Sequence, residues 1–484
     1  MPVEAAAEAP TLPRVGGAAS ALRLLHTMWD GTVESVVNVW DNCKERLAPP
    51  ELRYAKPLDG KVVIVTGGNA GIGLATAEQL ARRGAHVVLA CRDSARAEAA
   101  VQAIARATPL PGCCGTPRAP SPKPSPPIPP TGAASPASAP APAPAPAPGG
   151  PSGPLLHVEA MDLDLGRLDS VRAFARQWRR RGLPLHILVC NAGVMGPPKR
   201  MLTADGLELQ FQVNFLSHWL LANLLLEQER SRRDATRGSW ARPRLTAANS
   251  QQPTQPANGN HQLPKGWRLS APAGAASLTA PTAGAAGLGG ADAEEEQPGT
   301  RVVMVTSLTH RVGALQWHDK QSADSYNPFL SYGLSKLANI LTAKELQRRF
   351  EAQRLARSDG SPPYGEDSAV AVHPGLVSTH LANSFFSEHG TGWAAGTPLE
   401  GVVEGVVGGF GQLVGPLLTR TPDASAASML HACLAPASCV AGRYLALGRP
   451  TAPDQAAEDP RLAAELWSYA VQLTGGAHGS SSRA

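Results

Sequence analysis

Apolar residues form short uninterrupted runs along the chain, and most of these runs are followed by a stretch with helical periodicity. The runs are KVVIVTGG, AHVVLACR, LLHVEAMDL, LHILVCNAG, RVVMVTS and SAVAVHPG. Stretches such as GIGLATAEQLARRG repeat apolar residues every three or four positions. Strands that are apolar almost throughout are typical of a parallel sheet buried on both faces. The pattern therefore predicts an α/β domain, a doubly wound parallel sheet with helices on both faces.

Three segments interrupt this alternation. Residues 108–154 contain APAPAPAPGG, residues 229–299 run from RSRRDATR to EEE, and RSDGSPPYGED lies in residues 351–367. They hold few apolar side chains that could pack, so we expect disordered insertions, with the preceding long helix ending near Glu227. Loop closure entropy rises only slowly with length. We therefore predict one domain over residues 58–447, followed by a C-terminal helix and flexible tail over 448–484.

An N-terminal extension, residues 1–57, precedes this domain. Over residues 20–47 apolar residues that include Trp29 and Trp40 recur at helical spacing, which predicts an amphipathic helix. That helix either packs on the domain or lies at a membrane surface or partner. No segment reaches the roughly 18–20 apolar residues of a membrane span, and the N-terminus resembles neither a secretory signal nor a transit peptide. We expect a cytoplasmic or peripherally membrane-associated chain, and an organelle stays open.

Composition and charge narrow the function classes. Of the 484 residues, 43% are apolar, and much of the excess of 48 Gly and 45 Pro lies in the insertions. The net charge of +5 is mild and forms no basic stripe, so no nucleic-acid partner is expected. Seven cysteines without paired spacing favour a reducing compartment, and none forms a metal-binding pattern with histidine.

The first strand runs into a glycine-rich turn, TGGNAGIG, that opens a helix. Glycines let the backbone approach a pyrophosphate, and a helix N-terminus offers free N–H groups and partial positive charge. A strand, a glycine turn and a helix in one βαβ unit indicate a dinucleotide cofactor. The expected contacts in this turn are Gly67, Asn69, Gly71, Ile72 and Gly73.

Arg92 stands nineteen residues beyond Gly73, at the end of the second strand. An acid at this place would bond the ribose 2′-hydroxyl of NAD, whereas an arginine suits the 2′-phosphate of NADP. Asp93 follows immediately. The sequence therefore favours NADP (NADPH) over NAD.

The segment SYGLSK places Tyr332 and Lys336 one helical turn apart. Taken alone, this is an ordinary pair on a helix surface. It stands, however, in a series with TGGNAGIG, ACRD, DLDLGRLDSVRAF, CNAGVM, VNFLSHWLL, RVVMVTS and HPGLVSTHL. In this order the motifs resemble the short-chain dehydrogenase/reductase (SDR) family, above all its retinol dehydrogenase-like branch, with a weaker likeness to plant forever-young oxidoreductases. The resemblance covers residues 58 to about 447 and implies a single-domain Rossmann fold.

The resemblance also implies roles for individual residues. The implied catalytic residues are Asn214, which supports a water relay, Ser307, Tyr332 and Lys336. The implied further cofactor contacts are Asp164 (adenine), Leu165, Asn191, Ala192, Gly193, Tyr332, Lys336, Pro374, Gly375 and Thr379. Cys190 and Thr306 stand where the family more often has asparagine and serine, and Ser217 stands where many relatives have glycine. His218 and Trp219 are expected to pack in the long helix.

The chemistry of a carbonyl reduction explains these residue types. A free tyrosine has a pKa near 10, and a nearby ammonium and the nicotinamide charge are expected to lower it. Ser307 is suited to stabilise developing charge on the substrate oxygen. We therefore predict an NADP(H)-dependent oxidoreductase that interconverts a lipophilic alcohol and its carbonyl, such as a retinoid, steroid or fatty aldehyde. The alternative is an NADP(H)-binding regulatory or scaffold protein at a membrane or complex.

The substrate preference is expected to lie in residues 376–420, after the proline–glycine turn. This segment is apolar and rich in glycine. It either lines an apolar pocket for the substrate or forms an ordinary helix over the core. The sequence leaves the oligomeric state open.

Overall fold

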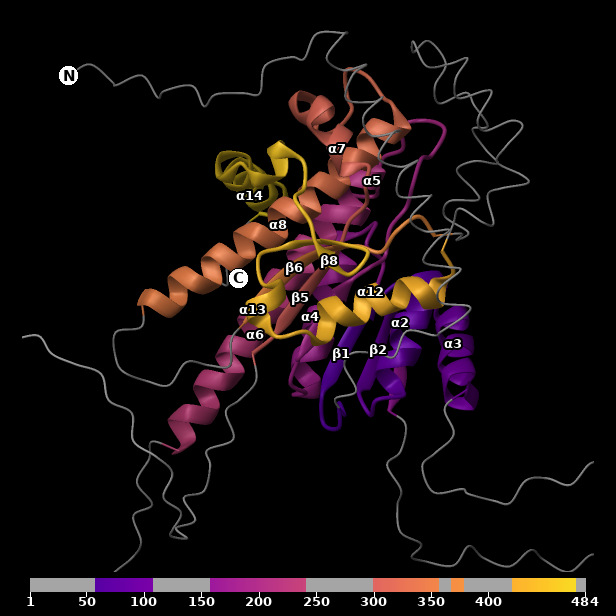
Figure 1. Cartoon of the computed structure of the whole chain (residues 1–484), viewed down its shortest axis with the longest axis vertical. Helices are drawn as coiled ribbons and strands as arrows, with labels where there is room; N and C mark the ends of the chain where they lie inside the picture. The colour runs from indigo at the N-terminus through magenta and orange to yellow at the C-terminus, as the bar shows by residue number, and fades with distance from the viewer. Residues whose placement is uncertain (1–56, 108–156, 241–298, 357–366, 378–419, 476–484) are drawn as a thin grey trace, which may run out of the picture.

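An eight-stranded sheet forms the centre of the molecule (Figure 1), which a computed structural model describes for residues 57–107, 157–240, 299–356, 367–377 and 420–475. The strand order is β3-β2-β1-β4-β5-β6-β7-β8. The strands are β1 (Val62–Thr66), β2 (His86–Cys91), β3 (Val158–Asp162), β4 (Ile187–Cys190), β5 (Arg301–Val305), β6 (Ser368–His373), β7 (Tyr444–Ala446) and β8 (Arg449–Pro450). All neighbours pair in parallel except β7 and β8. The predicted parallel sheet is confirmed.

Helices cover both faces of this sheet. One face carries α2 (Gly71–Ala81), α3 (Ser94–Ala107) and α12 (Pro422–Leu434), which lie together in Figure 1. The other carries α4 (Leu168–Arg181), α6 (Ser217–Trp240), α8 (Pro328–Ala356) and α14 (Pro460–Thr474). Short elements complete the fold: α5 (Leu209–Phe211), the π-turn η1 (Gln212–Leu216), α7 (His310–Gly313), the 3-10 turn η2 (Ala314–Asp319), α13 (Ala437–Val440) and η4 (Gln455–Glu458). The doubly wound Rossmann arrangement is therefore confirmed.

Alternation along β1 shows why the strands are apolar throughout. Val62 and Ile64 belong to the core under α4, α6 and α8, whereas Val63 and Val65 belong to the core under α2, α3 and α12. Successive side chains of a strand point to opposite faces, so a sheet covered twice needs apolar residues at every position.

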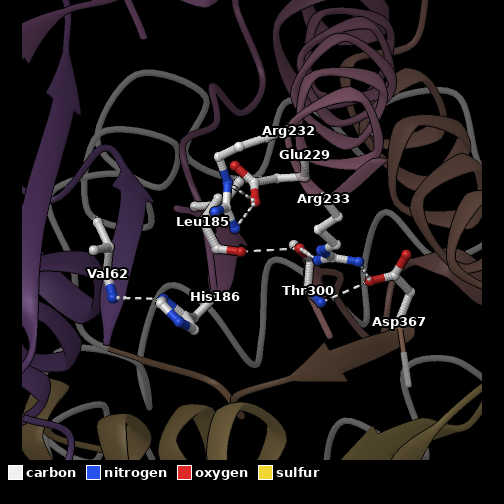
Figure 2. Close-up of polar contacts among 8 residues, drawn as sticks. All are labelled: Val62, Leu185, His186, Glu229, Arg232, Arg233, Thr300 and Asp367. Carbon is white, nitrogen blue, oxygen red and sulfur yellow. Dashed lines mark hydrogen bonds and ion pairs between the residues drawn. The ribbon is translucent and has the colours of Figure 1, made fainter. Parts of the chain in front are cut away.

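Helix α6 is longer than the sequence pattern predicted. It continues to Trp240, past the expected end near Glu227 and into the residues assigned to an insertion from 229. Arg233 is 3% exposed; its Nη1 lies 2.9 Å from Oδ1 of Asp367, and its Nη2 donates to Thr300 Oγ1 at 2.6 Å (Figure 2). Arg233, which the sequence pattern assigned to an insertion, is thus bonded at the amino ends of β5 and β6.

The other insertion boundaries shift in the same sense. Helix α8 is helical to Ala356, so residues 351–356 do not belong to an insertion. Residues 108–154 lie outside the described part of the chain, as do residues 241–298 and 357–366, the rest of the two other predicted insertions. The predicted amphipathic helix at 20–47 also lies outside it. Among the helices of the described ranges, none combines the length and apolar character that a membrane crossing requires.

The C-terminal helix α14 packs into the main core. Its Leu466 is buried, and the ring centroid of Trp467 lies 5.1 Å from that of Trp219 on α6 in an edge-on contact. The predicted packing role of Trp219 agrees with this contact. The core of the domain therefore extends to the end of α14.

Candidate active site

The glycine turn between β1 and α2 leaves a helix N-terminus open. Ala70 is the residue before α2; its side chain makes no capping hydrogen bond, and the first turn of α2 contains no acidic residue. The first N–H groups of a helix have no partner within the helix and bind anions readily. A Cβ at Gly73 would lie 2.4 Å from the carbonyl oxygen of Gly67 and 2.5 Å from Nδ2 of Asn191. Only glycine fits there, so the turn packs tightly against Gly67 and Asn191. The free N–H groups at the start of α2 are the groups that can bind a phosphate.

The remaining predicted residues of this turn take ordinary positions in it. Gly67 and Gly71 have positive φ angles of 64° and 54°, which other residues rarely adopt. Asn69 and Ile72 are half-buried at the start of α2. These placements agree with the expected cofactor turn, and the individual contacts stay predictions.

Arg92 and Asp93 follow the carboxyl end of β2 and are both exposed. Oδ1 of Asp93 accepts a hydrogen bond of 3.0 Å from the backbone N–H of Arg96, and its Oδ2 lies 3.3 Å from Nε of Arg96. Asp93 therefore caps the first turn of α3. Arg92 remains the charged group beside the glycine turn.

The Asn191–Ala192–Gly193 turn after β4 is bonded to the end of β1. The hydroxyl of Thr66 accepts the backbone N–H groups of Asn191 at 2.9 Å and Ala192 at 3.0 Å. Nδ2 of Asn191 donates to the carbonyl of Thr66 at 3.0 Å. These bonds place Gly193 close to the catalytic side: a Cβ there would lie 3.1 Å from Oδ1 of Asn214 and 3.7 Å from Nζ of Lys336.

Asp164 and Leu165 lie on the turn between β3 and α4. Oδ1 of Asp164 accepts from the N–H of Gly166 at 2.9 Å. Ser217, whose effect the sequence left open, donates to the carbonyl of Leu165 at 2.6 Å and so ties α6 to this turn. Asp164 and Leu165 follow β3, which lies on the other side of β1 from the predicted catalytic residues. An adenine would lie there if the cofactor crosses the carboxyl edge of the sheet.

Asn214 is fully buried in the π-turn η1. Its side chain closes two bonds with Val194, accepting from the N–H at 2.8 Å and donating to the carbonyl at 2.9 Å. Its Nδ2 also donates to Oγ of Ser335 at 3.0 Å, and Ser335 donates to the carbonyl of Tyr332 at 2.7 Å. Single π-turns occur often at functional sites. Here the turn connects the cofactor side with helix α8.

Tyr332 and Lys336 lie on α8 and are 7% and 4% exposed. Nζ of Lys336 is 5.3 Å from the ring centroid of Tyr332 and donates to the carbonyl of Val305 at 3.3 Å. Ser307 follows β5, and its hydroxyl is close enough to the Tyr332 side chain to lower the pKa of the phenol. The structure thus brings together the four residues predicted to be catalytic. Their catalytic role stays a prediction.

The electrostatics of the tyrosine differ from the expectation. Burial raises the pKa of Tyr332 well above its ordinary value, although the hydrogen bond from Ser307 opposes this rise. Burial lowers the pKa of Lys336 to about 8. The low-dielectric interior penalises the charged form of each group, the phenolate of Tyr332 and the ammonium of Lys336.

The segment after β6 enters this edge through Pro374 and Gly375, both buried, with φ of 99° at the glycine. Val377 pairs with Arg420 in an isolated bridge, and the N–H of Arg420 donates to the carbonyl of Leu376 at 2.8 Å. Thr379, and with it most of the predicted substrate segment, lies outside the described residues.

Sequence reasoning missed three polar residues that organise the site: Thr66, His218 and Ser335. His218 was expected only to pack, but both its ring nitrogens are hydrogen-bonded, to Thr66 Oγ1 at 2.9 Å and to the carbonyl of Asn214 at 3.0 Å. The spacing of His218 four residues after Asn214 was the available signal, since such residues face each other on a helix. Within the described ranges, no group of His, Cys, Asp and Glu side chains could hold a metal ion.

Several known proteins can be aligned with this chain over most of its length. The profile of the short chain dehydrogenase family matches residues 61–111. Polyprenol dehydrogenase of Mus musculus is 30% identical over 434 residues, which cover 90% of this chain and 88% of that protein. Retinol dehydrogenase 14 of Homo sapiens is 28% identical over 419 residues, covering 86% and 87%. A crystal structure of a protein from Mycobacterium Paratuberculosis aligns with a TM-score of 0.47 and 24% identity, over 87% of this chain and 96% of that one.

The extent of these matches goes well beyond the glycine turn. The alignment with the mouse protein spans nearly all of both chains at 30% identity. The motifs that carry the resemblance lie on the sheet edge where this fold binds nucleotide cofactors. The chain therefore belongs to the short-chain dehydrogenase/reductase family, in its retinol dehydrogenase-like branch, and is an oxidoreductase.

Proposed function

We propose that this protein uses NADP(H) to interconvert a lipophilic alcohol and its carbonyl compound. The observation that carries the proposal is the burial of Lys336 beside Tyr332. The hydroxyl of Ser307 acts on the same phenol, and a Cβ at Gly193 would lie 3.7 Å from the ammonium. A buried charge without an opposite charge is costly unless it serves a ligand or a reaction. No ion pair involves Lys336 among the described residues.

The residues present fit a nicotinamide dinucleotide phosphate. The uncapped N-terminus of α2 and the absence of room for a Cβ at Gly73 suit a pyrophosphate. Arg92 suits a 2′-phosphate, and the engagement of Asp93 with Arg96 removes the acid that would favour NAD. When bound, the cofactor supplies or accepts the hydride.

The chain's own residues supply the proton and the polar contacts. In the reducing direction, the phenol of Tyr332 gives its proton to the substrate oxygen, and the hydroxyl of Ser307 donates a hydrogen bond to that oxygen as charge develops. The ammonium of Lys336 stabilises the phenolate that remains. The raised pKa of Tyr332 keeps the phenol protonated, so that it can donate its proton to the substrate oxygen.

The proposed substrates are long isoprenoid or retinoid alcohols and aldehydes. Support comes from the relatives named for polyprenol and retinol, and from the apolar composition of the segment 376–420. The bridge between Val377 and Arg420 brings the two ends of that segment to the carboxyl edge of the sheet, where Tyr332 lies. A pocket wall at this place would favour an apolar ligand.

The experiment is a turnover assay of purified protein with NADPH and a panel of isoprenoid, retinoid and fatty aldehydes, and with NADP⁺ and the matching alcohols. In Tyr332→Phe we expect kcat to fall by about 10²–10⁴-fold, because the proton donor is lost, with NADPH affinity unchanged. Tyr469→Phe on α14 is the matched control and should keep full turnover. If no panel member is turned over by the wild type, or if Tyr332→Phe remains active, the proposed function is wrong.

Cofactor choice is measured separately, by titrating NADPH and NADH against wild type and Arg92→Ala. Loss of the guanidinium should weaken NADPH binding about tenfold and leave NADH binding nearly unchanged, because only NADPH carries the 2′-phosphate. A wild type that binds NADH more tightly than NADPH would contradict the assignment.

A further inference from the structure

His218 occupies a position between three parts of the candidate site. It is fully buried on α6. One ring nitrogen, Nδ1, lies 3.0 Å from the carbonyl oxygen of Asn214 in the π-turn. The other, Nε2, lies 2.9 Å from the hydroxyl of Thr66, which in turn carries the Asn191–Ala192 turn.

Counting donors and acceptors fixes the protonation state of the ring. The carbonyl of Asn214 can only accept, so Nδ1 of His218 must carry a hydrogen. Both lone pairs of the Thr66 hydroxyl are taken by the N–H groups of Asn191 and Ala192. The single hydroxyl proton is then left for Nε2, since its other acceptor, the carbonyl of Val189, is farther away at 3.3 Å. The neutral Nδ1–H tautomer satisfies every group.

The surroundings hold the ring in this neutral form. Burial lowers the pKa of His218 to about 4, and the positive charge of Lys336 acts in the same direction, while the bond to Asn214 opposes it. A proton on Nε2 would require a third acceptor site on the Thr66 oxygen, which has none. The ring therefore cannot protonate without breaking one of the bonds to the Asn191–Ala192 turn.

We propose that His218 is a positioning residue that couples the cofactor turn to the proton-transfer group, an inference that rests on the proposed function. Its Nε2 fixes Thr66 and with it the Asn191–Ala192 turn. Its Nδ1–H fixes the carbonyl of Asn214. The side chain of Asn214 bonds to Val194 and Ser335, and Ser335 in turn donates to the carbonyl of Tyr332. One imidazole thus aligns the turn at Gly193 with the helix that carries Tyr332 and Lys336.

Two substitutions separate the two ends of the ring. His218→Asn keeps a donor for the carbonyl four residues earlier, as Asn223 shows on the same helix by donating to the carbonyl of Trp219 at 2.8 Å, but it is too short to reach Thr66. His218→Phe removes both bonds and keeps the ring volume. Asn223→Ala is the matched control, because it deletes the same kind of helix bond away from the site.

The readouts are kcat, KM and the pH dependence of kcat for the oxidation reaction, together with the Kd for NADPH. We expect His218→Phe to lower kcat by about 10²-fold with little change in substrate KM, because misplacement of reacting groups acts on the reaction step. The pH at which kcat for oxidation is half-maximal should also rise in His218→Phe, because a displaced Lys336 ammonium stabilises the Tyr332 phenolate less. His218→Asn should keep the wild-type half-maximal pH while NADPH binding weakens about tenfold.

Asn223→Ala should lower stability only. The proposal is overturned if His218→Phe matches Asn223→Ala in kcat and half-maximal pH once both are compared below their unfolding temperatures. It is also overturned if His218→Asn shifts the pH profile as far as His218→Phe does.

A measurement without turnover keeps this inference distinct from the proposed function. In protein labelled with ¹⁵N-histidine, the signal that disappears in His218→Asn should report a neutral ring protonated at Nδ1, unchanged down to about pH 5. A ring protonated at Nε2, or one that titrates between pH 6 and 7, would sink the positioning role even if no substrate is ever found. A correct tautomer in a protein that turns nothing over would instead count against the proposed function.

Discussion

At the carboxyl edge of the sheet, Lys336 is buried and has no carboxylate partner among the residues that the structure describes. At the amino edge, the buried guanidinium of Arg233 is paired with Asp367. The polar residues of the first edge, such as Thr66 and Asn214, bond mainly to backbone atoms of turns. Those of the second edge join α6 to the starts of β5 and β6 (Figure 2). A buried charge with an opposite partner serves the fold, and a buried charge without one is free to serve a ligand.

The two edges also carry different connections. In a parallel sheet, strand-to-helix turns gather at the carboxyl edge and helix-to-strand connections at the amino edge. Three long connections, with residues 108–156, 241–298 and 357–366, each follow a helix and precede a strand. They therefore start and end at the amino edge, opposite the candidate site. At the carboxyl edge, the glycine turn and the Ser307 turn are short, whereas the connections after β4 and β6 are long.

The strongest way to break this comparison is to remove the ion pair at the amino edge. Arg233→Met should lower the free energy of unfolding by about 3–5 kcal/mol, because it leaves the Asp367 carboxylate partly buried without its cation. Turnover per folded molecule should not change, since no reacting group is touched. Urea unfolding and the turnover assay measure the two quantities.

The double variant Arg233→Met with Asp367→Leu is the control for this experiment. Without either charge, most of the lost stability should return. If Arg233→Met instead reduces kcat in fully folded protein, the division of roles between the two edges is wrong.

A second prediction concerns the pH dependence of stability that a buried histidine at the amino edge produces. His186 at the amino edge accepts the N–H of Val62 through Nδ1, and burial, together with the charges of Lys61, Arg232 and Arg233, lowers its pKa to about 4. The native state keeps this ring neutral while the unfolded chain protonates below about pH 6.5, so stability falls as pH drops from 6.5 towards 4. His186 alone should cost about 1–2 kcal/mol at pH 5.

The variant His186→Asn tests this effect, because its Oδ1 can still accept from Val62 but cannot titrate. Urea unfolding at pH 7.5 and pH 5 should show a smaller loss of stability in the variant than in the wild type. The remaining loss is expected to come from His218 and His310, whose pKa values burial lowers to about 4 and about 3. An unchanged pH dependence would show that His186 is not a neutral buried ring.

Sequence reasoning located the sheet and the candidate residues better than it located the bonds between them. The apolar runs and the glycine turn are local patterns, and they placed β1 to β6 and Gly67–Gly73 correctly, whereas β7 and β8 were not predicted. The links through Thr66 and His218 join residues 152 positions apart, which no local pattern contains. The end of α6 was misjudged for the same reason, because Arg233 in RSRRDATR bonds to Asp367 and Thr300, which lie far away in the sequence.

The smallest expected effect compares two glycines with the same backbone angle. Gly67 at the carboxyl edge and Gly182 at the amino edge both have φ of 64°, so alanine adds the same strain of about 1 kcal/mol at each. A Cβ at Gly182 meets nothing within 4 Å, whereas at Gly67 it would lie 3.0 Å from Cα of Ala192. The difference between the two variants in urea unfolding therefore isolates crowding at the cofactor turn, about a further 1 kcal/mol. Only Gly67→Ala should also weaken NADPH binding, because the turn must open to admit the methyl group. Equal unfolding energies and equal NADPH affinities in the two variants would mean that the carboxyl edge is no more tightly constrained than the amino edge.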